Sequence, residues 1–195
     1  MNYAIDKRAK AIILVGCIAI GSGLSYWFLH NGSFKTNDKP YELYEFTGDE
    51  RDIKDVEDMF KRDMYWLTTR PTYDVRAMMT RHTSEYDDPA NDGDLTIYIM
   101  RDKATGKMIG FTAYLKLSFY KGKILFIGVN PEFRGKRYAG ELVKFDFEQF
   151  KKMGLIKGML TTRVENAAAR KAYEREGMKD YMVHDGFVYY EKYVE

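Results

Sequence analysis

The sequence has little of the chemistry that holds disulfide-rich domains and metalloproteins together. Among its 195 residues there are one cysteine, three histidines and four prolines. A lone cysteine, Cys17, excludes a disulfide scaffold and a cysteine-rich zinc site. The histidines at positions 30, 82 and 184 are too scattered to suggest a metal centre, so we expect no bound metal.

The chain also lacks a strong charge of one sign. Its net charge is +2, with four basic and one acidic side chain in residues 1–35 and 27 basic against 28 acidic side chains in residues 36–195. The body is therefore nearly neutral, which argues against a nucleic-acid binder. A mean hydropathy of −0.48 and 45% apolar residues describe a globular protein with a substantial core.

One long uncharged run interrupts this composition. Residues 11–29 contain no charged side chain, and at about 1.5 Å per residue a helix of this length matches a hydrocarbon layer of about 30 Å. Basic residues precede the run, and an aromatic cluster at residues 26–28 ends it, where such rings prefer the membrane interface. We therefore predict a basic arm over 1–10, one transmembrane helix over 11–29 and a linker over 30–40.

Two alternatives stay open for this segment. A cleavable signal peptide has the same basic start and apolar middle, although no convincing small-x-small cleavage site ends the run. The stretch Leu14–Cys17 resembles a bacterial lipobox, whose cysteine is lipidated, but the apolar run continues well past Cys17.

The body, residues 41–195, shows alternating helical and strand patterns. Apolar residues spaced three and four apart predict helices over 51–68, 74–82 and 138–153, and a short alanine-rich helix over 166–176. Strands are expected at 41–46, 95–101, 108–118, 124–129, 156–164, 178–183 and 187–194, with turns at 102–107, 121–123 and 184–186. This order predicts a mixed α/β sandwich.

The segment 124–153 carries the clearest functional signal, because a buried strand leads through a basic, glycine-containing loop into a helix. Unpaired N–H groups at a helix start carry partial positive charge and bind phosphate. Arg134, Lys136 and Arg137 add full charges there. The loop matches neither the P-loop nor the dinucleotide-binding pattern, and taken alone it also fits a basic, solvated surface loop.

Two motifs resemble the GNAT family of N-acetyltransferases. Residues 129–142, VNPEFRGKRYAGEL, are similar to its acetyl-CoA motif, Gln/Arg-x-x-Gly-x-Gly/Ala: Arg134 takes the first position and Ala139 the last, while Arg137 replaces the middle glycine. Residues 166–178, NAAARKAYEREGM, are similar to a later motif of the family in the expected register. The resemblance covers about residues 41–195 and implies a mixed, mostly antiparallel sheet flanked by helices.

The resemblance also implies a cofactor site and its residues. Acetyl-CoA would be the cosubstrate, with its pyrophosphate on the backbone amides of residues 134–139 and its pantetheine arm along a bulged strand marked by Gly128. The residues implied to bind it are Gly128, Val129, Arg134, Gly135, Lys136, Arg137, Tyr138, Ala139 and Asn166. Taken alone, Arg137 also fits a solvent-exposed cation, and Asn166 fits a helix cap.

Tyr173 is the catalytic residue implied by the same register. Its hydroxyl would protonate the departing CoA thiolate, although one of 16 tyrosines also fits a packed aromatic. The strand 124–129 carries no carboxylate to act as general base. Substitutes could be Glu85, Asp87, Asp88 and Glu165, or the amine could arrive neutral.

We therefore expect a membrane-anchored N-acetyltransferase that acts on an amine of a small molecule or a protein. The alternative is a catalytically degenerate acyl-CoA-binding module, motivated by Arg137 and the missing strand carboxylate. The charge bias around the anchor weakly favours an external body, but acetyl-CoA is supplied in the cytosol, so we expect the domain to face the cytosol.

Overall fold

The computed structural model describes residues 38–70, 72–84 and 93–195. The elements follow in the order β1 (Tyr41–Glu45), α1 (Glu50–Leu67), α2 (Val75–Arg81), β2 (Leu95–Asp102), β3 (Met108–Lys116), β4 (Lys121–Val129), the 3-10 turn η2 (Pro131–Phe133), α3 (Tyr138–Lys152), β5 (Lys157–Arg163), α4 (Ala167–Arg175), β6 (Lys179–His184) and β7 (Phe187–Tyr193). The predicted order of helices and strands is confirmed, and η2 is the only described element that the sequence analysis did not anticipate.

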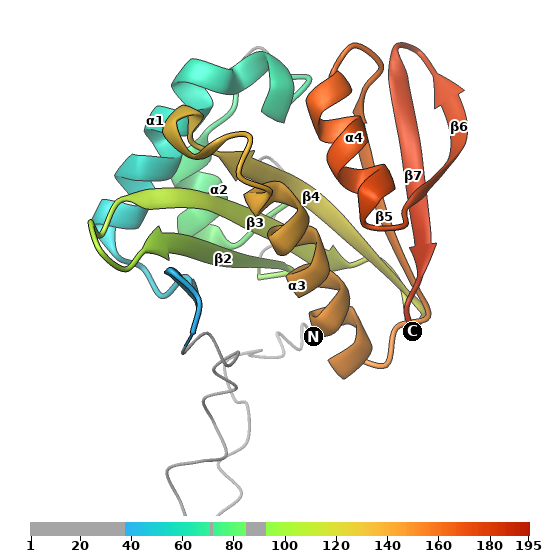
Figure 1. Cartoon of the computed structure of the whole chain (residues 1–195), viewed down its shortest axis with the longest axis horizontal. Helices are drawn as coiled ribbons and strands as arrows, with labels where there is room; N and C mark the ends of the chain where they lie inside the picture. Colours follow the sequence, from blue (N-terminus) through green and yellow to red (C-terminus); the bar gives the residue numbers. More distant parts are fainter. Residues whose placement is uncertain (1–37, 71, 85–92) are drawn as a thin grey trace, which may run out of the picture. The chain divides into compact units, whose positions relative to one another are not determined.

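The strands form one seven-stranded sheet in the order β1-β2-β3-β4-β5-β7-β6. Only β4 and β5 run parallel, and every other neighbouring pair is antiparallel. The predicted mixed, mostly antiparallel sheet is therefore confirmed. In Figure 1 the strands β5, β6 and β7 turn away from the β2–β4 part of the sheet, and α3 and α4 lie beside this divergence.

One predicted turn is wrong. Residues 121–123 were expected to be a turn between strands, but they are the start of β4 and pair with Lys157–Met159 of β5. The reversal comes earlier, where the Leu117 and Ser118 amides both donate to the Lys121 carbonyl. Gly122 is needed for packing, because a Cβ there would lie 2.5 Å from the Phe150 ring.

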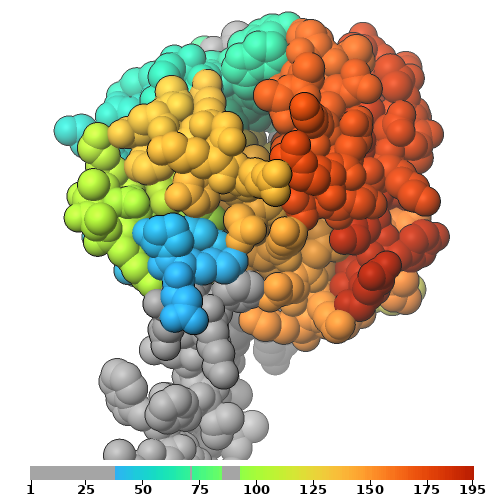
Figure 2. All heavy atoms as spheres, viewed as in Figure 1, coloured from blue at the N-terminus to red at the C-terminus, as the bar shows by residue number. Residues whose placement is uncertain are grey.

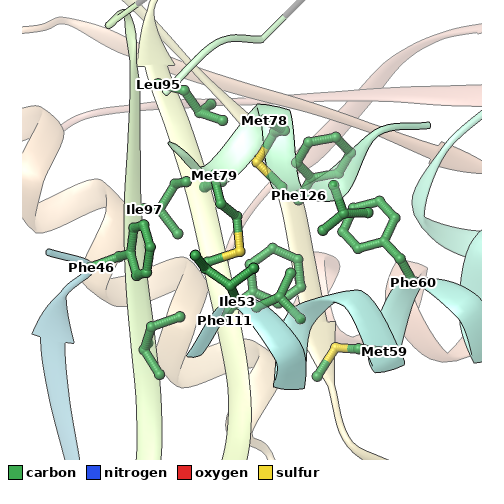
Figure 3. Close-up of a cluster of buried hydrophobic side chains, with 14 of the residues drawn as sticks. Phe46, Ile53, Met59, Phe60, Met78, Met79, Leu95, Ile97, Phe111 and Phe126 are labelled. Atoms are coloured by element: carbon green, nitrogen blue, oxygen red, sulfur yellow. The ribbon is translucent and has the colours of Figure 1, made fainter. Parts of the chain in front are cut away.

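The helices cover the two faces of the sheet with different apolar surfaces. Asp49 caps α1 through the Arg51 amide and Asp74 caps α2 through the Ala77 amide. The buried faces of α1 and α2 pack on the sheet in the cluster that Figure 3 shows, where side chains such as Met59, Phe60, Met78, Met79, Phe111 and Phe126 meet. The helix α3 buries residues such as Val143 and Phe150 in a separate cluster on the opposite face.

The predicted anchor over residues 11–29 lies outside the described residues. Among the helices in the described ranges, none combines the length and apolar character needed to cross a bilayer. The described chain therefore begins within the predicted linker, at residue 38.

Candidate active site

The parallel pair β4 and β5 separates shortly after it forms. Lys121–Lys123 pair with Lys157–Met159, and beyond these residues the two strands continue unpaired with each other to Val129 and Arg163. A cleft of about 690 Å³ occupies this opening. The splayed strands therefore leave one edge of β4 available to a ligand.

The cleft has three walls. The C-terminal half of β4 and the start of α3 form one, the end of β5 with α4 forms the second, and Met59, Asp63, Trp66 and Leu67 of α1 form the third. Figure 2 shows the surface hollowed between the gold residues that precede and begin α3 and the orange residues of α4. Most of the residues singled out from the sequence lie on these walls.

The bulge in β4 is not at Gly128. The pairing of β3 with β4 shifts register between Ala113 and Tyr114, which leaves Leu125 as the extra residue. Gly128 instead allows close packing, because a Cβ there would lie 2.3 Å from the Met59 sulfur and 2.6 Å from Cε1 of Phe111. The strand is bulged as the family resemblance implied, but the glycine that suggested it serves the contact with α1.

The loop before α3 has the backbone conformation of a phosphate cradle. Gly135 has φ of 78°, and Arg137 has φ of 69° and ψ of 10°, which is left-handed. Arg137 occupies the N-cap position of α3, and no side chain accepts a hydrogen bond from the first amides of the helix. These amides and the positive end of the helix dipole are therefore available for an anion.

Arg134 is held by contacts that the sequence analysis missed. Its Nε donates to the Val129 carbonyl at 2.9 Å, and its Nη2 donates to the Asp63 carboxylate at 2.6 Å. Asp63 lies at a kink in α1, where its φ of −115° and ψ of 20° depart from helical values. Arg62 also donates to Asp63, at 2.8 Å from Nη2, and to the Asn130 side chain at 3.0 Å.

This cluster ties the α1 kink to the loop that follows β4. Asp63 is largely buried, with 9% of its surface exposed, and its partner Arg134 lies 71 residues further along the chain. From the sequence alone, an acidic residue in an amphipathic helix is expected to be exposed to solvent. The one signal that could have pointed to Asp63 is that it interrupts the apolar pattern of the helix. The guanidinium of Arg134 therefore anchors the loop both to α1 and to the end of β4.

The opposite wall is built from α4. The Asn166 side chain accepts from the Ala169 amide at 3.2 Å, so it caps α4 and also lines the cleft. Tyr173 lies on the same wall and is 8% exposed, with its ring edge-on to Tyr190. Burial, with the nearby Asp146 carboxyl, raises the pKa of Tyr173 well above its ordinary value, so the hydroxyl remains protonated at neutral pH.

The predicted cofactor residues converge on the cleft with one exception. Gly128, Val129, Arg134, Gly135, Arg137, Tyr138, Ala139 and Asn166 line it together with Tyr173. Lys136 does not line it, because its ammonium group lies over the Phe133 ring, 5.3 Å from the ring centroid. The loop alternates its side chains, so a run of three cations does not place all three at one site.

Of the suggested bases, Glu85, Asp87 and Asp88 lie outside the described residues. Glu165 lines the cleft and accepts a hydrogen bond from the Tyr65 hydroxyl, which lowers the pKa of its carboxyl. A lowered pKa makes Glu165 a weak proton acceptor, and a better electrostatic partner for a cation.

Two parallel strands therefore part around a cleft, next to the uncapped N-terminus of α3. The sequence profile described as the acetyltransferase (GNAT) family matches residues 53–178. The chain belongs to this family, and it is an acetyl-CoA-dependent N-acetyltransferase. No curated protein sequence matches the chain.

Solved structures with this fold are numerous. The chain is similar to spermidine N-acetyltransferase from Vibrio cholerae, in complex with CoA and spermine, with a TM-score of 0.63 and 16% identity over 80% of this chain and 96% of that one. It is similar to the ribosomal-protein-S18-alanine N-acetyltransferase of Escherichia coli, with a TM-score of 0.58 and 13% identity over 79% and 94%. PaiA N-acetyltransferase from Thermoplasma acidophilum, in complex with coenzyme A, has a TM-score of 0.59 and 15% identity over 78% and 98%.

Proposed function

We propose that this protein is a membrane-tethered N-acetyltransferase that holds acetyl-CoA in the cleft between β4 and β5. The observation that carries the proposal is the convergence of three features on one cleft: the uncapped start of α3, the unpaired edge of β4 and the buried Tyr173. Each feature fits a different part of the same cosubstrate.

The start of α3 fits the pyrophosphate. The backbone amides between Arg134 and Ala139 are arranged around two left-handed residues, Gly135 and Arg137, and no side-chain cap competes for the helix N-terminus. Arg137 lines the cleft, so its guanidinium adds a full positive charge to the dipole of the helix. Lys136 contributes to the local potential from outside the cleft.

The edge of β4 fits the pantetheine arm. Gly128 and Val129 lie on this edge where β5 has already separated, so strand-like pairing with the amides of the arm is possible. Asn166 faces the same space from the other wall, and its capping bond to Ala169 fixes its position.

Tyr173 fits the role of hydrogen-bond donor to the departing sulfur. Its raised pKa means that the hydroxyl is always protonated under physiological conditions. The reference pKa of a thiol, about 8.5, lies well below that of this tyrosine. The hydroxyl therefore stabilises the thiolate by donating a hydrogen bond, and full proton transfer is completed by exchange with solvent.

The acceptor is an amine, and its class is suggested by two relatives. One is named for spermidine and the other for the alanine of a ribosomal protein. Glu165 at the mouth of the cleft, with its lowered pKa, favours an acceptor that approaches as a cation. Polyamines and the N-terminal amines of basic proteins are therefore the first acceptors to try.

The tether is the apolar run 11–29, and the catalytic domain faces the cytosol in this proposal. Support comes from the length of the run, its basic flank and its aromatic end. A cytosolic domain has direct access to acetyl-CoA, which is the reason to prefer this side over the weak bias of the flanking charges.

The decisive experiment is acetyl transfer by the full chain to a panel of polyamines, peptide N-termini and lysine peptides. We expect turnover on at least one acceptor, and the Tyr173→Phe variant to lower kcat by about a hundredfold, the usual cost of losing one positioned donor that stabilises developing negative charge. Tyr181→Phe is the matched control, because Tyr181 is an exposed tyrosine on β6, away from the cleft. Tight CoA binding without turnover on any acceptor would contradict the proposal.

A further inference from the structure

A fully buried aspartate on α3 lies outside the residues that line the cleft. Asp146 has 0% of its surface exposed, on the helix face that packs against the sheet. Its Oδ2 lies 2.6 Å from the Thr112 hydroxyl of β3, and its Oδ1 is buried without a hydrogen-bond partner among the described residues. Burying an incompletely paired carboxyl is costly, so its retention calls for a structural or functional reason.

The surroundings of Asp146 favour the neutral acid. Burial raises the pKa of its carboxyl well above the ordinary value, and its hydrogen bond with Thr112 opposes this shift only in part. The groups that face it across the core are apolar or aromatic, and the tyrosines with raised pKa near it, Tyr98, Tyr114 and Tyr173, carry no charge at neutral pH. No described cation is paired with it.

A neutral Asp146 fixes the direction of a short hydrogen-bond chain. The Thr112 hydroxyl is within reach of two partners, Asp146 Oδ2 at 2.6 Å and the Phe126 carbonyl at 3.2 Å. A hydroxyl has one proton to donate. If the carboxylic acid donates to the Thr112 oxygen, Thr112 is free to donate to Phe126, and every polar group in the chain except Oδ1 is satisfied.

The chain ends at the bulge in β4. Leu125 is the extra residue, and Phe126 follows it opposite Ala113. Because the Asn130 amide donates to the Ile109 carbonyl, the alternation of an antiparallel ladder makes Phe126 and Ala113 a hydrogen-bonded pair. The Phe126 carbonyl therefore points toward β3, where Thr112 also reaches it.

The orientation of that carbonyl fixes the next amide. In a trans peptide the carbonyl of one residue and the N–H of the next point in opposite directions. The Ile127 N–H therefore points away from β3, toward the side from which β5 has separated, and Ile127 lines the cleft. It is a backbone donor on the face where the thioester is expected.

We propose that Asp146 and Thr112 are positioning residues that lock the 126–127 peptide at the bulge, so that the Ile127 N–H is aimed at the thioester carbonyl. The inference rests on the proposed function, because it assigns the donor that polarises the reacting carbonyl. A bulge loosens the ladder where it occurs, and a donor that stabilises developing charge must be held in place before the reaction. The hydrogen bonds from Asp146 of α3 through Thr112 to Phe126 supply that restraint, from the side of the sheet opposite α1.

The kinetic test compares four variants of the full chain. Thr112→Val removes the hydroxyl at nearly constant shape, and Thr112→Val combined with Asp146→Leu replaces both partners by apolar groups, which is close to neutral for stability. We expect kcat to fall by about tenfold in both variants while the dissociation constant for CoA changes little, since one backbone donor is misplaced. Asp146→Asn, which can still donate to Thr112, is expected to recover most of the turnover.

Ile97→Val is the matched control. It removes one methyl group from the buried cluster on the α1 side of the sheet, away from both the cleft and the hydrogen bonds that join Asp146, Thr112 and Phe126. It is expected to keep the activity of the unaltered chain. A folded double variant with unimpaired kcat, or an Asp146→Asn variant as slow as Thr112→Val, would overturn the proposal.

A second measurement needs no acceptor and no turnover. The amide resonance of Ile127 in the nuclear magnetic resonance spectrum of the ligand-free chain should broaden or shift in Thr112→Val and in the double variant, and should stay in place in Asp146→Asn. An unmoved Ile127 resonance in both would refute the positioning role even if the chain acetylates amines. If the Ile127 resonance shifts as expected but the protein acetylates no acceptor, the positioning role is supported and the proposed function is rejected.

Discussion

Arg137 has a backbone conformation that side chains other than glycine rarely adopt, at the residue where α3 begins. Its φ of 69° lies in the left-handed region, which costs an ordinary residue about 1–2 kcal/mol. Strain of this kind persists where the surrounding structure or a function requires it. The position matches the glycine of the family motif, so the conformation is retained while the residue that suits it has changed.

Arg137→Gly should therefore stabilise the fold and weaken CoA binding. We expect a gain of about 1 kcal/mol in the free energy of unfolding from relief of the left-handed strain, measured by urea denaturation. The dissociation constant for CoA should rise and depend less on salt, because one cation that faces the phosphates is lost.

Asp185→Gly is the control for this prediction. Asp185 is another non-glycine residue with positive φ, 49°, and it lies in the turn between β6 and β7, outside the residues that line the cleft. It should gain stability without any change in CoA affinity. Equal CoA affinity in the Arg137 variant would show that the guanidinium does not contact the cosubstrate.

Asp146 makes stability depend on pH in a direction that can be measured. A carboxyl whose pKa is raised in the folded state contributes most favourably below its unfolded pKa of about 3.9, and that contribution is lost as pH rises and the unfolded chain ionises. Asp146→Asn removes this loss. The variant should melt at the same temperature as the unaltered chain near pH 4 and at a higher temperature at pH 7, by scanning calorimetry. A constant difference across this range would mean that Asp146 is ionised in the fold.

At the scale of an element, β4 does three things at once. Its first three residues pair with β5, its bulge at Leu125 lines the cleft, and its end packs against α1 through Gly128. The close approach extends to the neighbouring strand, because a Cβ on Gly110 would lie 2.2 Å from the Gly128 carbonyl oxygen. The position of α1, and of Asp63 on it, therefore depends on a glycine in β4.

Gly128→Ala should push α1 away from the sheet. A methyl group 2.3 Å from the Met59 sulfur cannot be accommodated without movement, and overpacking of this kind costs about 1–3 kcal/mol. Combining it with Met59→Ala should cost less than the two single changes added together, because the second change makes room for the first. Denaturant unfolding of the four proteins gives the coupling energy, and strict additivity would show that Phe111 rather than Met59 limits the space.

At the scale of the whole molecule, the charge separates into two parts. Residues 1–35 carry four basic and one acidic side chain, a net charge of +3, and residues 36–195 carry a net charge of −1. Within the domain the positive charge that matters is local, at the loop before α3. The protein therefore combines a basic, apolar N-terminal segment with a nearly neutral domain. The proposal that the domain faces the cytosol rests on its need for acetyl-CoA and not on this charge distribution, which weakly favours the opposite side.

The full chain should behave as an integral membrane protein. We expect it to stay with the membrane fraction after an alkaline carbonate wash. Phe119 has 82% of its surface exposed, so protease should cleave near it, and only when the cytosolic side of the membrane is accessible. A variant that lacks residues 1–29 should be recovered without detergent. A domain that resists protease in intact cells and is digested in inverted membrane vesicles would support the cytosolic orientation. Digestion in intact cells and resistance in inverted vesicles would show that the domain lies outside.

The sequence predicted the elements and much of the site because both are written in local patterns. Helical spacing and turn residues such as Asp185-Gly186 were enough to give the order of strands and helices. The two motifs named cofactor residues of which all but Lys136 line the cleft. It failed at residues 121–123, where a glycine between lysines reads as a turn but serves the packing of Phe150.

Only the tertiary structure decided how distant residues act on one another. The pairing of Asp63 with Arg134, the bulge at Leu125 and the chain from Asp146 to Phe126 join elements that are far apart in sequence, and no periodicity records such contacts. The same holds for Lys136, which the motif predicted to bind the cofactor with its neighbours. In the structure its ammonium group lies over the Phe133 ring instead. The sequence by itself determined the family, the order of elements and the loop that suits a phosphate, since these depend on neighbouring residues. The cleft and the orientation of its donors depend on where two strands separate, which the packing of the whole domain sets.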